Sequence, residues 1–409
     1  MKRLVLISPY CDGTDVGEIH WVYQWVSQLA ARYEVTLLTM ERPGRQPLAE
    51  QLPDIHLVTW PEPSWVCRHE RLNAMMKPAY PWFYGRAKEW LLANREHIGL
   101  VHQLGPVALR YPCPAHALDV PYVIGPQAGS LKTPEVLRND GRIDAWYARL
   151  RGLDHWRLKN DPWLKRSYEN AAAVIGVADY VREHLGQLRL QRFVTESEIA
   201  ISSLEMRRDY AGRGLRSLLH VGRGVRTKGL VDAIRCVDRL RHEYPDIRLV
   251  SAGHGPEIDR CRGIVAALGL QANVDFVGQV SRERIEALYS EADIFLFPSF
   301  REPSGSVVLE AMRHGLPVIG ADYGGPGHVI DQSCGVSVLP SRPEQFADNL
   351  AEAVTGLIRS PHYCQVLSDG ARNRAAALGL WENKLDRIDA LYRDVLGKAI
   401  STNARAKAA

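Results

Sequence analysis

Two glutamates with seven residues between them are candidates for binding a ligand rich in hydroxyl groups. Glu302 lies in a loop after an apolar segment, and Glu310 comes one turn into an expected helix. Gly305 permits close approach of the backbone to a ligand, and the free N–H groups of Ser306 and Val307 at the helix start suit a phosphate. The Glu310 carboxylate is able to accept two hydrogen bonds from a ribose diol, while Glu302 is able to reach sugar hydroxyls.

The alternative for this glutamate pair is a solvated surface helix, because charged side chains are mostly exposed. The Pro-Ser-Gly-Ser turn at residues 303–306 and the apolar run at residues 307–309 favour a ligand site instead.

A glycine loop with three cations provides the second signal. Residues 222–229 read Gly-Arg-Gly-Val-Arg-Thr-Lys-Gly and lie between an expected strand and an expected helix. The loop is not a dinucleotide fingerprint, because Thr227 stands where the third glycine belongs. Arg223 and Lys228 are able to neutralise a diphosphate leaving group, and the Arg fork matches paired phosphate oxygens. An ordinary basic surface loop remains the alternative.

The second half of the chain alternates strand-like and helix-like segments, which predicts a parallel sheet covered by helices. The expected strands are 218–221, 247–252, 274–277, 294–297 and 317–319, and the expected helices are 230–244, 256–268, 282–291 and 306–314. The first half repeats this alternation more loosely, with strands at 4–8, 35–39 and near residues 100, 122 and 174, and a helix at 18–33. Residues 61–95 fit neither period and are interpreted as an insertion.

A polar, glycine-bearing segment at residues 205–216 predicts a domain boundary. We therefore expect an N-terminal domain at 1–210 and a C-terminal domain at 211–380. A last helix at about 381–397 is expected to pack back on the N-terminal domain.

Length and composition agree with a two-domain globular protein. The chain has 409 residues, of which 46% are apolar and 24% charged. A net charge of +4 is too weak to indicate nucleic-acid binding. Seven cysteines without a Cys-x-x-Cys pair favour reduced thiols in a cytoplasm over disulfides or a zinc site. No segment approaches the ~20 apolar residues of a membrane span.

Taken together, these segments resemble family 4 of the retaining glycosyltransferases over about residues 215–345. Further matches lie at 253–256 (Gly-His-Gly-Pro), 276–280 (Phe-Val-Gly-Gln-Val), 315–319 (Gly-Leu-Pro-Val-Ile) and 324–326 (Gly-Gly-Pro). The resemblance implies the GT-B fold, an α/β architecture of two Rossmann-like, doubly wound parallel-sheet domains facing each other across a cleft. It assigns acceptor binding to the N-terminal domain and nucleotide-sugar binding to the C-terminal domain.

The resemblance also implies residue roles on the donor side. In the family, the Gly-Arg…Lys-Gly loop holds the donor diphosphate, which assigns that role to Arg223 and Lys228. The first glutamate contacts the transferred sugar and the second the ribose, which assigns Glu302 and Glu310. The remaining donor-binding candidates are Gly17 in the first glycine-rich loop, Gly278 and Val280 near the base, and Gly305, Ser306 and Val307 at the helix start.

The acceptor side departs from the family pattern. Many members carry a histidine after a mid-domain strand, where residues 122–129 read Tyr-Val-Ile-Gly-Pro-Gln-Ala-Gly. We interpret this as a subgroup feature. His102, His20 and Gln127 are the candidates for the acceptor side, and for both histidines a structural role is the alternative.

Without an Asp-x-Asp motif, the sequence predicts a reaction with neither metal nor cofactor, in which cations and a helix N-terminus stabilise the leaving group. By resemblance the product keeps the donor's anomeric configuration. We expect a UDP-sugar donor and a glycan or lipid-linked acceptor in cell-surface polysaccharide or lipopolysaccharide synthesis. Aromatic and basic segments at 60–95 and 138–166 fit peripheral association with the inner face of a membrane. The alternatives are a soluble natural-product acceptor, a nucleotide-sugar epimerase of the same fold, and a sugar-binding protein without activity.

Overall fold

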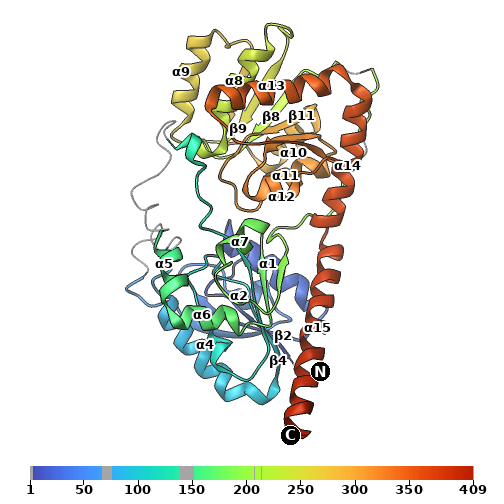
Figure 1. The fold of residues 1–409 in the computed structure, drawn as a ribbon. Helices are drawn as coiled ribbons and strands as arrows, with labels where there is room; N and C mark the ends of the chain where they lie inside the picture. The colour runs from blue at the N-terminus through green and yellow to red at the C-terminus, as the bar shows by residue number, and fades with distance from the viewer. Residues whose placement is uncertain (1–2, 67–75, 139–151, 207, 213, 409) are drawn as a thin grey trace. The chain divides into compact units, whose positions relative to one another are not determined.

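The computed structural model of the protein describes residues 3–66, 76–138, 152–206, 208–212 and 214–408 (Figure 1). Packing divides the chain into two compact units. The first unit comprises Met1–Ser130, Leu150–Glu198 and Lys384–Ala409, and the second comprises Leu131–Arg149 and Ile199–Asn383. The end of the chain therefore belongs to the same unit as its beginning.

The first unit is built on a parallel sheet of seven strands in the order β3-β2-β1-β4-β5-β6-β7. Its strands are β1 (Arg3–Ile7), β2 (Val35–Glu41), β3 (His56–Pro61), β4 (Ile98–Gln103), β5 (Tyr122–Gln127), β6 (Ala173–Gly176) and β7 (Phe193–Thr195). Its helices are α1 (Glu18–Ala30), α2 (Leu48–Gln51), α4 (Tyr80–Asn94), α5 (Gly152–Asn160), α6 (Pro162–Glu169), α7 (Asp179–His184) and most of α15 (Trp381–Ala408).

The second unit is built on a parallel sheet of six strands in the order β10-β9-β8-β11-β12-β13. Its strands are β8 (Ser217–Val221), β9 (Arg248–Ala252), β10 (Val274–Gly278), β11 (Ile294–Phe297), β12 (Val318–Ala321) and β13 (Gly335–Val338). Its helices are α8 (Leu230–Leu240), α9 (Ile258–Leu268), α10 (Arg282–Glu291), α11 (Ser306–Arg313), α12 (Gly324–Val329), α13 (Pro343–Arg359) and α14 (Pro361–Gly379).

The central strands are short, unbroken apolar runs because helices cover both faces of a parallel sheet. All four residues of β11 are buried, and so are residues 4–7 of β1. In the second unit, α8 and α13 pack on each other through buried aliphatic side chains such as Ile234, Leu350 and Val354. Alternating strands and amphipathic helices thus produce a doubly wound sheet in each unit, as the sequence predicts.

The segment expected to be an irregular insertion contains a regular helix, α4. Its buried residues Tyr80, Phe83, Tyr84, Ala87 and Leu91 recur at helical spacing, with a proline at the helix start. The period was obscured because two of the three buried aromatic residues, Tyr80 and Tyr84, also contain a polar hydroxyl group. The rest of that segment includes residues 67–75, which lie outside the described residues.

Three strands escaped the sequence analysis. β3 and β7 contain only partly buried or exposed residues, and β13 buries only its two end residues. These strands lie at the edges of the two sheets, where one neighbour is missing and burial is weaker. α15 also runs further than the expected end near residue 397.

Within the described part of the chain, no helix combines the length and the apolar character that crossing a membrane requires. Six of the seven cysteines lie in the described ranges, where all six are buried free thiols. Burial raises the pKa of one of them, the Cys334 thiol, to about 11.

Candidate active site

The strand order reverses at one point in each sheet, and that point selects the candidate site. In the second sheet β8 and β11 are neighbours, although three helices and two strands separate them in sequence. At such a switch point the loops after two adjacent strands diverge and leave a crevice at the carboxyl edge of the sheet. The glycine loop follows β8 and the first glutamate follows β11, so the sequence motifs meet at the switch point.

The glycine loop packs against the loop after β9 with almost no space between the two backbones. The Gly224 N–H donates to the His254 carbonyl at 2.9 Å, and the Gly222 N–H donates to Ala252 at 3.0 Å. A Cβ added to Gly253 would lie 1.8 Å from the Gly222 oxygen, and Gly253 has a φ of 142°. Only glycine fits there.

The three cations of the loop have different partners. Arg226 is buried and forms two hydrogen bonds with Asp232, at 2.6 and 2.9 Å. Arg226 therefore stabilises the loop and is unavailable to a ligand. Arg223 is exposed and, within the described residues, its guanidinium has neither an ion-pair nor a hydrogen-bond partner. Lys228 forms an ion pair with Glu302.

Hydrogen bonds to backbone carbonyls fasten the loop after β11 to the glycine loop and to the start of α12. The Ser299 hydroxyl and the Phe300 N–H both donate to the Thr227 carbonyl, at 3.0 and 3.2 Å. The Glu302 carbonyl accepts the Gly325 N–H at 2.8 Å. The side chains of Lys228 and Glu302 are only 12% and 10% exposed. The backbone thus holds two predicted site residues in contact within a sheltered position.

The start of α11 supplies free N–H groups. This helix begins at Ser306, four residues after Glu302. Gly305 precedes the helix in the left-handed conformation, with φ 78°. An added Cβ would lie 3.2 Å from the Gly325 backbone, so the turn has little room for a side chain. The N–H groups of Ser306 and Val307 belong to the first turn, which has no intrahelical acceptors. The positive end of the helix dipole adds to their attraction for an anion.

Glu310 lies one turn further along α11 and is largely buried. Burial raises the pKa of its carboxyl, and a hydrogen bond from Tyr289 opposes this shift. The Tyr289 hydroxyl lies 3.2 Å from Glu310 Oε2. Tyr289 was not identified from the sequence, because it is 21 residues from Glu310 and no motif contains it.

Gly278 and Val280 lie at the carboxyl end of β10, two strands from the switch point. Gly278 has a φ of 73°, and its carbonyl accepts the Gly253 N–H at 2.8 Å. Val280 packs against the apolar cluster beneath this edge of the sheet. Both residues therefore belong to the same sheet edge as the ion pair.

In the first unit the switch point lies between β1 and β4. Gly17 precedes α1 with φ 66°. The next residue, Glu18, accepts the Val107 N–H at 3.2 Å and forms an ion pair with Lys77 at 3.1 Å. His20 lies one turn into α1, with Nδ1 3.0 Å from the Gly13 carbonyl. Glu18 and Lys77 thus occupy this switch point, and the sequence analysis assigned a role to neither.

The surroundings of His102 favour a structural role over a role in acceptor binding, and those of Gln127 favour a structural role as well. His102 is fully buried in β4, and its ring nitrogens contact the Tyr392 hydroxyl and the Gly125 carbonyl. Burial lowers the pKa of His102 to about 4. Gln127 is also fully buried, donates to Pro106 and accepts from Tyr168. Both side chains are thus hydrogen-bonded inside the first unit and have no exposed surface in the described structure.

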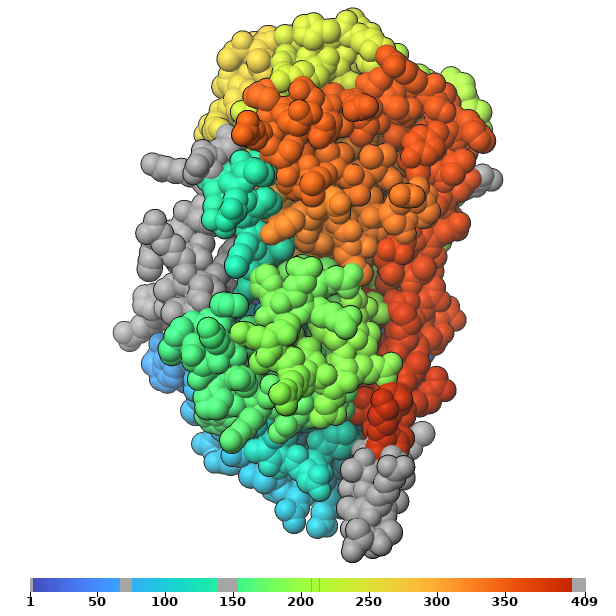
Figure 2. Space-filling model, in the orientation of Figure 1, coloured from blue at the N-terminus to red at the C-terminus, as the bar shows by residue number. Residues whose placement is uncertain are grey.

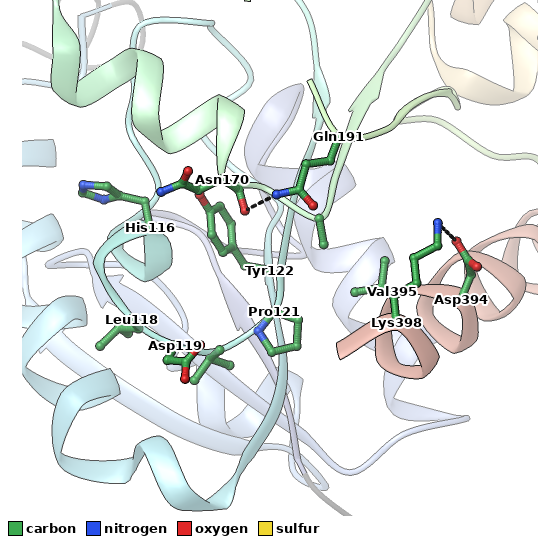
Figure 3. A pocket seen from close by; sticks show the side chains of 12 residues that line it. His116, Leu118, Asp119, Pro121, Tyr122, Asn170, Gln191, Asp394, Val395 and Lys398 are labelled. Atoms are coloured by element: carbon green, nitrogen blue, oxygen red, sulfur yellow. Dashed lines mark hydrogen bonds and ion pairs between the residues drawn. The ribbon is translucent and has the colours of Figure 1, made fainter. Parts of the chain in front are cut away.

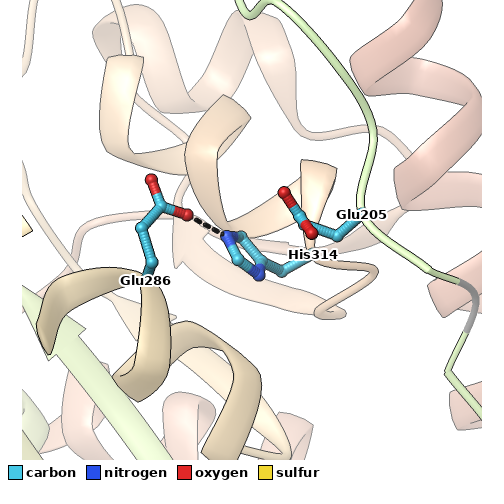
Figure 4. A group of neighbouring side chains, drawn as sticks. All are labelled: Glu205, Glu286 and His314. Atoms are coloured by element: carbon cyan, nitrogen blue, oxygen red, sulfur yellow. Dashed lines mark hydrogen bonds and ion pairs between the residues drawn. The ribbon is translucent and has the colours of Figure 1, made fainter. Parts of the chain in front are cut away.

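The side chains of Glu205, Glu286 and His314 form a cluster in the second unit (Figure 4). His314 Nε2 lies 2.7 Å from Glu286. Arg313 forms ion pairs with both glutamates, at 2.6 Å to Glu205 and 3.3 Å to Glu286. Because the Arg313 guanidinium already forms ion pairs with both carboxylates, we interpret the cluster as an ion-pair network.

A cavity of about 360 Å³ lies in the first unit, at the amino ends of β5 and β6 (Figure 3). Its polar lining includes Asp119, Gln191 and the ion pair of Asp394 with Lys398 at 3.1 Å. It lies at the opposite edge of the sheet from Gly17, so it is separate from the candidate site.

Comparison with known proteins defines the family. A family model described as "Glycosyl transferases group 1" matches residues 208–374, and one described as "Glycosyltransferase Family 4" matches residues 20–195. The chain belongs to glycosyltransferase family 4. The first of these ranges contains Arg223, Lys228, Glu302 and Glu310.

Individual family relatives match parts of the chain, and solved structures match nearly all of it. Glycogen synthase from Mycobacterium tuberculosis is 34% identical over 170 residues, which are 41% of this chain and 40% of that protein. The chain thus spans less than half the length of this relative. Sucrose-phosphate synthase from Thermosynechococcus elongatus has a TM-score of 0.68 at 20% identity, covering 97% of this chain and all of the other. HepE of Anabaena, solved with UDP, has a TM-score of 0.63 at 16% identity, covering 96% and 100%. These structures confirm the GT-B fold.

Proposed function

We propose that the protein is a retaining, metal-independent glycosyltransferase that moves a sugar from a UDP-sugar to a hydroxyl group. The observation that carries this proposal is the sheltered ion pair of Lys228 and Glu302 at the switch point of the second sheet. Arg223, on the same loop, is exposed and has no partner in the described part of the chain. Family membership supports the reaction class.

In the proposed reaction, the bond between C1 of the sugar and the terminal phosphate oxygen breaks. The acceptor oxygen bonds to C1 on the same face, and the acceptor's proton passes to the departing phosphate oxygen. Arg223, Lys228 and the first N–H groups of α11 stabilise the negative charge that grows on the diphosphate. No metal or cofactor enters this scheme.

The ligand-free ion pair gives Lys228 and Glu302 coupled roles. A diphosphate is a stronger partner for Lys228 than a single carboxylate is. Donor binding would draw the ammonium toward the phosphates and release Glu302 to accept hydrogen bonds from the sugar. Glu310 would bind the ribose, and Gly278 and Val280 would lie near the base. UDP is the proposed nucleotide because the structurally similar HepE was solved with it.

For the acceptor we propose a glycan or lipid-linked precursor of a surface polysaccharide or lipopolysaccharide. Partly buried or exposed tryptophans in the first unit support an amphipathic acceptor, with Trp156 60% and Trp163 50% exposed. Residues 139–151, part of the basic segment expected to serve this purpose, lie outside the described residues. A nucleotide-sugar epimerase would need acid and base groups at the sugar, and buried His102 is not available for that task.

The proposal is tested by incubating the protein with UDP-sugars, with and without acceptors, and following the products by mass spectrometry. We expect a glycosylated acceptor and released UDP, and slow sugar release without acceptor. NMR of the product should show the donor's anomeric configuration. Isomerised sugar nucleotide would instead identify an epimerase, and an unchanged donor with every acceptor would identify a binding protein.

A further inference from the structure

Tyr289 contacts Glu310 from a neighbouring helix. The tyrosine lies near the end of α10, a helix that Ser281 caps through the Arg284 N–H. Its side chain is 1% exposed. Its hydroxyl lies 3.2 Å from Glu310 Oε2 and 3.5 Å from the Val307 carbonyl. Since an ionised carboxylate and a carbonyl only accept, the tyrosine hydroxyl is the donor.

The Tyr289 ring is itself held from two sides. It stacks on the His314 ring at a centroid distance of 5.3 Å and an interplanar angle of 22°. It also contacts Phe295, with 5.7 Å between centroids. His314 is fixed in turn by Glu286, as Figure 4 shows. The hydroxyl therefore occupies a defined position before any ligand arrives.

The backbone of the same region is held by one arginine. Arg208 donates to the carbonyls of Tyr289, Ala292 and His314, the last at 2.7 Å. Arg208 thus joins the end of α10 to the end of α11. This arrangement keeps the distance between the Tyr289 ring and the Glu310 helix constant.

The charges around Glu310 make its ionised form depend on this contact. Burial raises the pKa of Glu310, and Glu286 raises it further. The Tyr289 hydrogen bond and the positive charges of Arg282 and Arg313 lower it. A protonated Glu310 would lose one acceptor for the ribose hydroxyls.

We propose that Tyr289 is a positioning residue for donor binding, whose hydroxyl donates a hydrogen bond to the Glu310 carboxylate and fixes it in one orientation. One carboxylate oxygen is then aligned by Tyr289, and the remaining lone pairs are left for the ribose diol. This inference rests on the proposed function, because it assigns the ribose to Glu310.

The test measures UDP binding by calorimetry between pH 6 and 8.5 for the wild type, Tyr289→Phe, Glu310→Gln and the double variant. We expect Tyr289→Phe to weaken UDP binding roughly 10-fold at neutral pH, as loss of a hydrogen bond to a charged group does. The loss should be larger at the acidic end of this range than at the alkaline end, because removal of the Tyr289 hydroxyl raises the pKa of Glu310. In the Glu310→Gln background, Tyr289→Phe should cause no further loss.

Tyr210→Phe is the matched control. Tyr210 is also fully buried in the second unit, and its hydroxyl donates to the Asp293 carbonyl at 2.9 Å. The control variant also loses one buried tyrosine hydroxyl, but at a position away from Glu310. It should bind UDP as the wild type does, at every pH. Thermal unfolding of both variants shows whether each is folded.

Two results would overturn the inference in different ways. If Glu310→Gln weakens UDP binding and Tyr289→Phe does not, the positioning role is wrong while the proposed function stands. If Glu310→Gln itself binds UDP like the wild type, the ribose lies elsewhere and the donor-site assignment fails together with the inference.

Discussion

At the scale of single residues, the proposed donor site is a set of charged side chains, most of which are paired with one another in the ligand-free structure. Lys228 and Glu302 are neutralised as a pair, and Arg226 is permanently engaged by Asp232. Arg223 is left exposed. A diphosphate would therefore meet two different cations. Arg223 has no partner in the described part of the chain, whereas Lys228 would exchange Glu302 for the diphosphate.

This arrangement predicts the response to substitution. Arg223→Ala and Lys228→Ala should each lower kcat ~100-fold or more, because each removes a donor from the charge that develops on the leaving group. Glu302→Gln should also affect turnover more than UDP affinity. Steady-state kinetics with and without EDTA measure these effects, and EDTA should change little.

Arg248→Ala is the control for the cation variants. Arg248 is equally exposed but begins β9, at the amino edge of the same sheet. An enzyme that EDTA silences and that tolerates Arg223→Ala would contradict this account of the leaving group.

Two buried histidines make stability depend on pH. Burial lowers the pKa of both His102 and His220 from 6.5 to about 4. Below pH 6.5 the unfolded chain therefore binds protons that the folded chain does not bind. The contribution of the two histidines to the free energy of unfolding is fully present above pH 6.5 and is lost as the pH falls toward 4. The midpoint temperature of thermal unfolding should therefore be lower at pH 5 than at pH 7.

His220→Phe tests this origin, since phenylalanine cannot be protonated. His220 lies against the Phe297 ring, with 5.8 Å between centroids and an interplanar angle of 40°, so an aromatic replacement keeps this contact. The variant should show a shallower pH dependence than the wild type over the same range. An equal slope would assign the effect to other groups.

At the scale of elements, the sequence predicted the strands and helices that have one strong period. β8, β11 and α11 were predicted because an apolar run, a glycine turn and an amphipathic segment follow one another. The resemblance assigned Lys228 and Glu302 to one ligand, but their contact depends on the order of the strands in the sheet, which periodicity does not predict. Tyr289 and Arg208 could not be predicted, because their partners are set by packing between helices far apart in sequence.

The same limit applies to α15. Periodicity predicts a helix, but not the buried charges it brings to the first unit. Lys384 is fully buried, 3.1 Å from Glu196 and close to the Trp25 ring. Arg387 also binds Glu196, at 2.6 Å. No motif at either position indicates this cluster.

Glu196→Ala should destabilise the first unit by about 3–5 kcal/mol, because it leaves the buried Lys384 ammonium without its counter-charge. Chemical denaturation measures the change. The control is Glu382→Ala, an exposed glutamate in the first turn of α15. Equal midpoints for the two variants would show that the buried ion pair adds nothing to stability.

At the scale of the whole molecule, the exposed tryptophans are the feature least expected of a protein that works only in solution. Trp156 and Trp163 lie on α5 and α6, near the exposed cations Lys159 and Arg166. Green residues of this region form part of the surface in Figure 2. An aromatic and basic surface suits the interface of an anionic membrane.

Binding to anionic vesicles should therefore weaken as salt rises from low to physiological concentration. Replacing both Trp156 and Trp163 by serine should reduce binding at every salt concentration. Flotation with anionic and neutral vesicles measures both effects. Absence of binding to anionic vesicles at low salt would favour a soluble acceptor.

The return of the chain to its first unit has a consequence for how the protein is made. Ribosomes release the amino-terminal residues first, and domains generally fold as they emerge. Here, however, His102 and Glu196 must wait for Tyr392 and Lys384 from α15. The second unit is complete by Asn383, when only the first residues of α15 have been synthesised. The half that is translated first is thus the half that finishes folding last.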